Sequence, residues 1–143
     1  MKNLEENLIS RNAHEEMIID KLNLKPKDMK KMKTINIKGK NYVTVNERIK
    51  YFREHFTGYG MLTEITHIAD KVCIIKASII NAEGLTVANG HAREEAGSSF
   101  INKTSHIENA ETSAWGRALA NFGIGVDESV ASADEVANAI RNQ

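Results

Sequence analysis

The stretch of sequence that most constrains the fold is TSHIENAETSAWGRALANFGIG, residues 104–125. Its apolar residues recur every three or four positions, which predicts one long helix with an apolar stripe along one side. Ser105 and Glu108 have the spacing of a capping box, so we expect the helix to begin there, and Gly123 is expected to end it. The stripe, which we expect to lie in the core, consists of Ile107, Ala110, Ala114, Trp115, Ala118, Leu119 and Phe122.

The opposite side of this helix carries small, uncharged residues where a solvated helix usually carries Lys and Glu. They are Asn109, Thr112, Ser113, Gly116 and Ala120, with Arg117 at their border. A glycine in mid-helix costs about 1 kcal/mol relative to alanine. We therefore expect something to approach closely at Gly116, and the sequence leaves open an element of the same chain, a second subunit or a ligand. Glu111 falls within the apolar stripe and is expected to have a buried or intersubunit partner.

The chain is predicted to form one domain preceded by an arm, which suits its 143 residues. Residues 1–33 have loosely helical apolar spacing and a linker-like end that contains the single proline, so we expect an N-terminal arm that is partly helical or disordered. Residues 34–143 are predicted to form an α+β domain with its helices on one face of an antiparallel sheet.

The expected order within the domain is β-hairpin, helix, three-stranded antiparallel meander, long helix and short helix. Thr44 with Glu47 and Ser132 with Glu135 have capping-box spacing, and they mark the starts of the two shorter helices. Successive side chains of a strand point to opposite faces of the sheet, so in the middle strand Cys73 should face the core and Lys76 the more solvated face. The predicted segments are a hairpin within 34–45, a helix from 45 to about 56, strands at 61–69, 72–80 and 85–91, and a helix from 132 to about 141.

Charge is balanced overall but unevenly distributed. The formal net charge is zero, which argues against a uniformly basic coat. Residues 25–53 are rich in Lys and Arg, whereas residues 104–143 are mainly acidic. Such polarity fits either a nucleic acid or a head-to-tail contact between subunits.

The sequence favours binding over catalysis. The five histidines are scattered, no phosphate loop is present and no nucleophile has a partner base, so we expect no metal, no cofactor and no enzymatic activity. Cys73 is expected to be a buried strand thiol. The chain has no apolar run long enough to cross a membrane and its N-terminus lacks an apolar signal region, so we expect a cytoplasmic protein without a membrane partner.

Basic residues supply the candidate binding site. Lys103 lies just before the long helix, whose N-terminus favours an anion, and Phe100 is close enough in sequence to supply a stacking ring. Together with other basic residues, Lys103 could line a groove that follows a phosphate backbone, although a scattered solvated surface is equally compatible with the sequence. The candidate DNA-binding residues are Lys38, Lys40, Arg48, Lys50, Arg53, Lys76, Arg93, Lys103 and Arg117.

Two stretches resemble the Rad-fifty-two-like single-strand annealing proteins, including short phage recombination proteins. Residues 42–60, YVTVNERIKYFREHFTGYG, are similar to the strand, helix and Phe-Gly-Tyr-Gly-like turn that precede the family's meander. The long helix carries a similar signature of Ala, Thr, Arg-Ala-Leu and Phe-Gly. The matching residues are Ala110, Thr112, Arg117, Ala118, Leu119, Phe122 and Gly123, whereas Gly116 and Ala120 replace residues that are often basic in the family.

The resemblance covers about residues 42–125 and implies a function. It implies a DNA-binding protein that holds single-stranded DNA in a groove lined by sheet and long helix and promotes strand annealing in recombination and repair. It also implies a homo-oligomer, as a ring or filament, in which Arg117 contacts DNA. The alternative is a non-catalytic protein-interaction or assembly module that has lost DNA binding, which the neutral charge and Gly116 favour.

Overall fold

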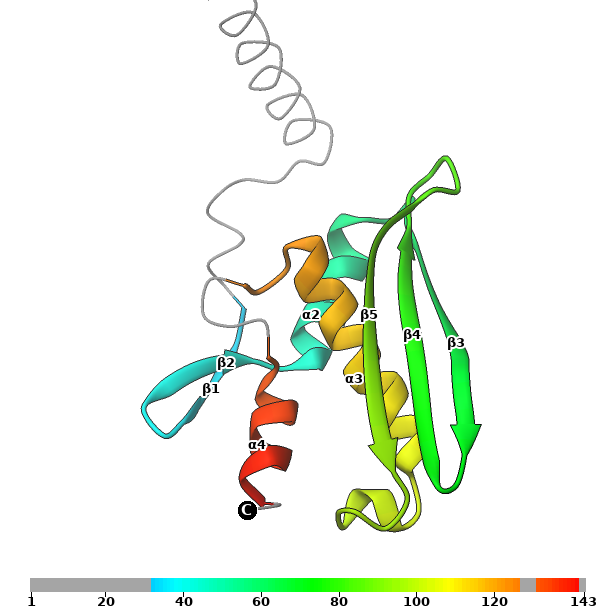
Figure 1. The fold of residues 1–143 in the computed structure, drawn as a ribbon. Helices are drawn as coiled ribbons and strands as arrows, with labels where there is room; N and C mark the ends of the chain where they lie inside the picture. The colour runs from blue at the N-terminus through cyan, green and yellow to red at the C-terminus, as the bar shows by residue number, and fades with distance from the viewer. Residues whose placement is uncertain (1–31, 127–130, 142–143) are drawn as a thin grey trace, which may run out of the picture. The chain divides into compact units, whose positions relative to one another are not determined.

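The computed structural model describes residues 32–126 and 131–141, which are coloured in Figure 1. The predicted arm over residues 1–33 lies, apart from its last two residues, outside the described part of the chain. The described elements confirm the predicted α+β class. They are β1 (Thr34–Ile37), β2 (Lys40–Val43), α2 (Val45–His55), β3 (Gly60–Ala69), β4 (Val72–Ile80), β5 (Thr86–Glu95), the 3-10 helix η2 (Ile101–Lys103), α3 (His106–Phe122) and α4 (Ala133–Arg141).

The main sheet is the predicted antiparallel meander, in the order β3-β4-β5, and α2 and α3 lie on one of its faces (Figure 1). The middle strand alternates as expected. Cys73, Ile75, Ala77 and Ile79 are buried, whereas the residues between them are half-buried on the other face. Burial of Cys73 also raises the pKa of its thiol. The sheet therefore has one face covered by helices and one open face.

Helix α3 is held closely between the sheet and α2. A Cβ atom at Gly90 of β5 would collide with the α3 backbone at Arg117 and Ala118. On the other side of α3, a Cβ atom at Gly116 would lie only 2.7 Å from Cγ2 of Val45. The close neighbour that the sequence predicts at Gly116 is therefore α2 of the same chain.

The three predicted capping boxes have different outcomes. Ser132 and Glu135 form the reciprocal pair at the start of α4, with N···O distances of 2.8 and 3.2 Å. The Thr44 hydroxyl accepts from the backbone N–H of Glu47, which confirms the start of α2. Ser105 makes no capping bond, so that prediction is wrong. Its backbone, at φ −141° and ψ 39°, is outside the extended region that a capping side chain needs, and its N–H bonds Ile101 in the preceding turn instead.

The ends of the other elements differ little from the prediction. Gly123 has φ 108°, the left-handed conformation that commonly ends a helix, and α3 stops there as expected. Strand β5 continues to Glu95, beyond the predicted end at residue 91. Its last residues are polar, but they pair with the apolar start of β4, so the partner strand determines their conformation.

Candidate nucleic-acid interface

The segment between β5 and α3, residues 96–105, presents an aromatic ring to solvent; we call it the Phe100 loop. The Phe100 side chain is 86% exposed, the largest value among the exposed large apolar residues of the described chain. Nζ of Lys103 lies 5.9 Å from the centre of its ring. An aromatic face and a cation are thus presented side by side.

A buried asparagine fixes the conformation of this loop. Asn102 is 1% exposed, and its side-chain amide donates to Oε2 of Glu94 at 2.6 Å and to Oγ of Ser98 at 2.9 Å. Its backbone carbonyl accepts from Gly97, and its side-chain oxygen accepts from the amide of Asn109 on α3. The sequence analysis missed Asn102, because a single polar residue in a loop belongs to no periodic pattern.

The β3–β4 turn lies beside the Phe100 loop and adds a further cation. The carbonyl of Lys71 accepts from the backbone N–H of Ala96 at 2.7 Å, and Lys71 is exposed. Arg93, near the end of β5, is also exposed and forms an ion pair of 3.5 Å with Glu95. An exposed ring with nearby cations can stack a base and attract its phosphates.

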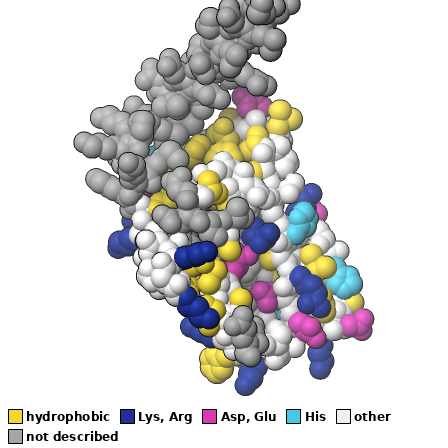
Figure 2. Space-filling view, turned by 60° about the vertical axis from the view of Figure 1, so that its left-hand side comes forward, with side chains coloured by type: hydrophobic (Ala, Val, Ile, Leu, Met, Phe, Trp, Pro, Cys, Tyr) yellow, Lys and Arg dark blue, Asp and Glu magenta, His cyan; other side chains and the backbone are white. Residues whose placement is uncertain are grey.

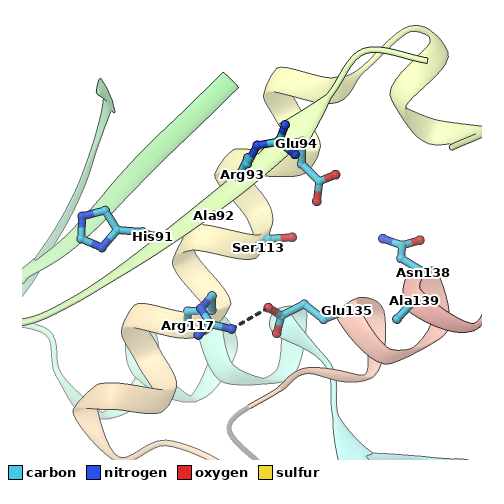
Figure 3. Close-up of a pocket in the computed structure, with 9 residues that line it drawn as sticks. All are labelled: His91, Ala92, Arg93, Glu94, Ser113, Arg117, Glu135, Asn138 and Ala139. Carbon is cyan, nitrogen blue, oxygen red and sulfur yellow. Dashed lines mark hydrogen bonds and ion pairs between the residues drawn. The ribbon is translucent and has the colours of Figure 1, made fainter. Parts of the chain in front are cut away.

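A polar groove, the α4 groove, separates α4 from α3 and β5. It consists of two cavities of about 350 and 360 Å³, both lined by Ser113 and Asn138. The first is drawn in Figure 3, where Ser113 of α3 and Glu94 of β5 face Asn138 of α4. The second reaches Ile101 and Ser105. The α4 groove therefore runs from the Phe100 loop along α3 toward Arg117.

The small-residue side of α3 is divided between this groove and the core. Asn109, Thr112 and Ser113 line the groove. Gly116 and Ala120 are buried, Gly116 against Val45 as described above. Glu111, as expected, has a partner, because its carboxylate accepts from the Thr63 hydroxyl at 2.8 Å.

Arg117 lies at one end of the α4 groove and is already paired. Its side chain is 44% exposed, and Nη1 is 3.2 Å from Oε1 of Glu135 on α4, the contact dashed in Figure 3. Charged residues of both signs line the groove along its length, together with His91. They are the basic Arg93, Arg117 and Arg141 and the acidic Glu94, Glu108, Asp134 and Glu135.

Arg48 is a structural residue and does not reach the surface. It is fully buried, and its guanidinium donates to the carbonyls of Gly116 at 3.0 Å and Gly125 at 3.4 Å. Burial lowers the pKa of Arg48, while Glu135 and Asp134 oppose that shift. The predicted DNA contact at Arg48 therefore requires correction. Its helical position beside Val45 and Phe52 was the sequence signal that it belongs to the buried face.

The other predicted basic residues lie on separate elements. Lys50 and Arg53 are exposed on α2, and Lys38 and Lys40 are exposed at the turn between β1 and β2. Lys76 is half-buried on the open face of the sheet, where it pairs across strands with Glu64 and His91. Figure 2 shows Lys and Arg side chains at separate places on one face, with Asp and Glu among them. Of the nine predicted residues, Lys103 lies in the Phe100 loop, and Arg93 and Arg117 line the first cavity of the α4 groove.

The described residues contain neither a metal-binding cluster nor a membrane-spanning helix. Among them, no cluster of three or more His, Cys, Asp or Glu side chains is arranged to hold a metal ion. None of the helices in residues 32–126 and 131–141 has both the length and the apolar character of a membrane span.

Comparison with protein families assigns a family that differs from the one expected. The model of the family described as Slr1353 N-terminal dsRNA-binding domain-like matches residues 49–122, just over half of the chain, from within α2 to the end of α3. Searches of curated proteins and of solved structures find no match. The resemblance to the Rad-fifty-two-like annealing proteins is thus wrong as a family assignment.

Proposed function

This chain belongs to the Slr1353 N-terminal dsRNA-binding domain-like family, and from that premise we propose that its domain binds nucleic acid at the Phe100 loop. The family description fits a nucleic-acid-binding or protein-interaction module. We infer that the ligand is a single strand, or an unpaired stretch beside a duplex. Phe100 stacks on a base, while Lys103 and Lys71 attract phosphates.

The exposure of Phe100 carries this proposal. An aromatic side chain that is 86% exposed contributes little to the core, yet Asn102 and its partners hold the loop that presents it. Stacking of a base on an aromatic side chain contributes about 1–3 kcal/mol. Because the bases of a duplex are already stacked on one another, an unpaired base offers its face to Phe100 more readily.

Duplex RNA is the second form of nucleic acid to test, because the family description names it. Domains of the double-stranded RNA-binding class recognise shape over about 16 base pairs, through backbone contacts in two minor grooves and the major groove between them. Here such contacts would have to come from Lys50 and Arg53 on α2 as well as from the Phe100 loop.

Strand annealing and oligomerisation are further parts of the proposal. Stacking uses the face of a base and leaves its pairing edge free, so a strand held on Phe100 remains able to meet a complementary strand. Several copies along one strand would keep it extended for pairing. A labelled complementary strand and light scattering, added to the binding experiment, measure annealing and assembly respectively.

Fluorescence anisotropy with labelled single-stranded DNA, single-stranded RNA and duplex RNA tests the proposed function. We expect binding to single strands, and about tenfold weaker binding for Phe100→Ala, within the range of stacking energies. Leu85→Ala is the matched control, because Leu85 is 63% exposed in the β4–β5 turn, away from the Phe100 loop. Absence of binding to all three probes, or equal affinity of Phe100→Ala and the wild type, would contradict the proposal.

A protein-interaction module is the second candidate function, and the balanced charge of the α4 groove favours it. In that case light scattering would show assembly while anisotropy showed no binding to any probe. The open face of the sheet, where Leu62 is 61% exposed, would then be the surface to alter first.

A further inference from the structure

We propose that α4 is an acidic gate over the Arg117 end of the α4 groove, where Glu135 competes with nucleic-acid phosphates for Arg117. This inference rests on the proposed function and adds a regulated second contact to it. The groove begins at the Phe100 loop, because Ile101 and Ser105 line its near cavity. A strand stacked on Phe100 that continued along α3 would therefore meet Arg117 beneath α4.

Two polar contacts join the N-terminal end of α4 to the rest of the domain. Glu135 pairs with Arg117, and a carboxylate oxygen of Asp134 accepts from the backbone N–H of Val45 at 3.1 Å. Within α4 only Ala133 is buried. In contrast, α2 buries several large side chains, including Phe52. Displacing α4 therefore exposes little buried apolar area, and its main cost is the separation of Glu135 and Asp134 from the buried Arg48.

The gate changes the charge that a phosphate meets. On the α3 and β5 sides of the first cavity the cations are Arg93 and Arg117, and the nearby Glu94 is engaged by Asn102 at 2.6 Å. Helix α4 adds Glu135 to that cavity, and it adds both Asp134 and Arg141 to the second cavity, which Glu108 of α3 also lines. With α4 in place Arg117 is neutralised, and with α4 displaced it is available to a phosphate.

The test is a set of charge-removing variants measured by anisotropy with labelled single-stranded DNA. Glu135→Gln should tighten binding about two- to fivefold, the range expected for release of an exposed ion pair. Glutamine at this position still caps α4, because a capping box accepts either Glu or Gln. Glu83→Gln is the matched control, because it removes the same charge from the exposed β4–β5 turn.

A double-mutant cycle shows whether the effect passes through Arg117. In an Arg117→Gln background, Glu135→Gln should no longer tighten binding. The proposed gate is wrong if Glu135→Gln binds single-stranded DNA no more tightly than Glu83→Gln does. It is also wrong if Glu135→Gln still tightens binding in the Arg117→Gln background. In either case, weaker binding by Phe100→Ala would still support the proposed function. Absence of binding in the wild type and every variant overturns both.

Discussion

The two ends of α3 differ in what covers them. The C-terminal half is enclosed: Gly116 touches Val45, the Arg48 guanidinium bonds the Gly116 carbonyl, and Gly90 admits the helix backbone against the sheet. The N-terminal half borders the α4 groove and begins at the Phe100 loop. The same small-residue face therefore serves packing at one end and leaves open space at the other. What covers a residue, rather than its type alone, decides its role.

The two ends also differ in the forces that hold them. The enclosed half depends on apolar burial and on the buried Arg48, whereas the open half, which also buries Ala110 and Ala114, is joined to the Phe100 loop by the hydrogen bond from Asn109 to Asn102. We therefore expect substitutions in the enclosed half to change mainly the stability, and substitutions at the open end to change mainly the binding.

The largest effect is expected from Arg48→Ala, which should lower the free energy of unfolding by about 3–6 kcal/mol. Two carbonyls lose hydrogen bonds from a charged donor, each worth about 1.5–3 kcal/mol. Urea unfolding followed by circular dichroism measures the change. Lys50→Ala, at an exposed position of the same helix, is the control and should stay within about 0.5 kcal/mol of the wild type. If Arg48→Ala and Lys50→Ala had equal free energies of unfolding, the hydrogen bonds of Arg48 would not stabilise the enclosed half of α3.

A smaller effect should distinguish two alanine substitutions on α3. Gly116→Ala places a Cβ atom 2.7 Å from Val45, and the overpacking cost of about 1–3 kcal/mol exceeds the gain of about 1 kcal/mol in helix propensity. Thr112→Ala, on the exposed side, should be neutral or stabilising by about 0.5 kcal/mol. The same urea experiment compares them. If both substitutions changed the free energy of unfolding in the same direction, the two ends of α3 would not differ in how closely they are packed.

The smallest effect concerns salt dependence at the open end. Lys103→Gln should reduce the slope of log affinity against log salt for single-stranded DNA by about 0.7, the value for one lost phosphate contact. Its unfolding midpoint should not change, because Lys103 is exposed. Lys38→Gln, on the β1–β2 turn, is the control and should leave the slope unchanged. A reduced slope for Lys38→Gln and an unchanged slope for Lys103→Gln would indicate that the phosphate contacts lie on the β1–β2 hairpin.

The sequence predicted most of the fold because periodicity and caps are local signals. The long helix, the alternation in β4 and the Ser132–Glu135 capping box follow from neighbouring residues alone. The cap at Ser105 failed because η2 sets the backbone there. The end of β5 was misplaced because pairing with β4 overrides its polar sequence. These determinants come from other segments of the chain.

The candidate site was predicted less well than the fold. Phe100 and Lys103 were placed together correctly by their nearness in sequence, but Arg48 was assigned to the surface and Asn102 was missed. The helix signature behind the family resemblance consists largely of packing residues, since Ala110, Ala118 and Leu119 are buried and Gly123 forms the left-handed end. Packing of this kind suits a helix on any similar sheet and does not distinguish families.

Photo-crosslinking shows whether an unpaired base stacks on Phe100. Single-stranded DNA containing 5-iodouracil would be irradiated with the 143-residue chain, and the crosslinked peptide identified by mass spectrometry. We expect crosslinks within residues 96–105 that are lost in Phe100→Ala. Crosslinks confined to the β1–β2 hairpin or to the open face of the sheet would contradict this expectation.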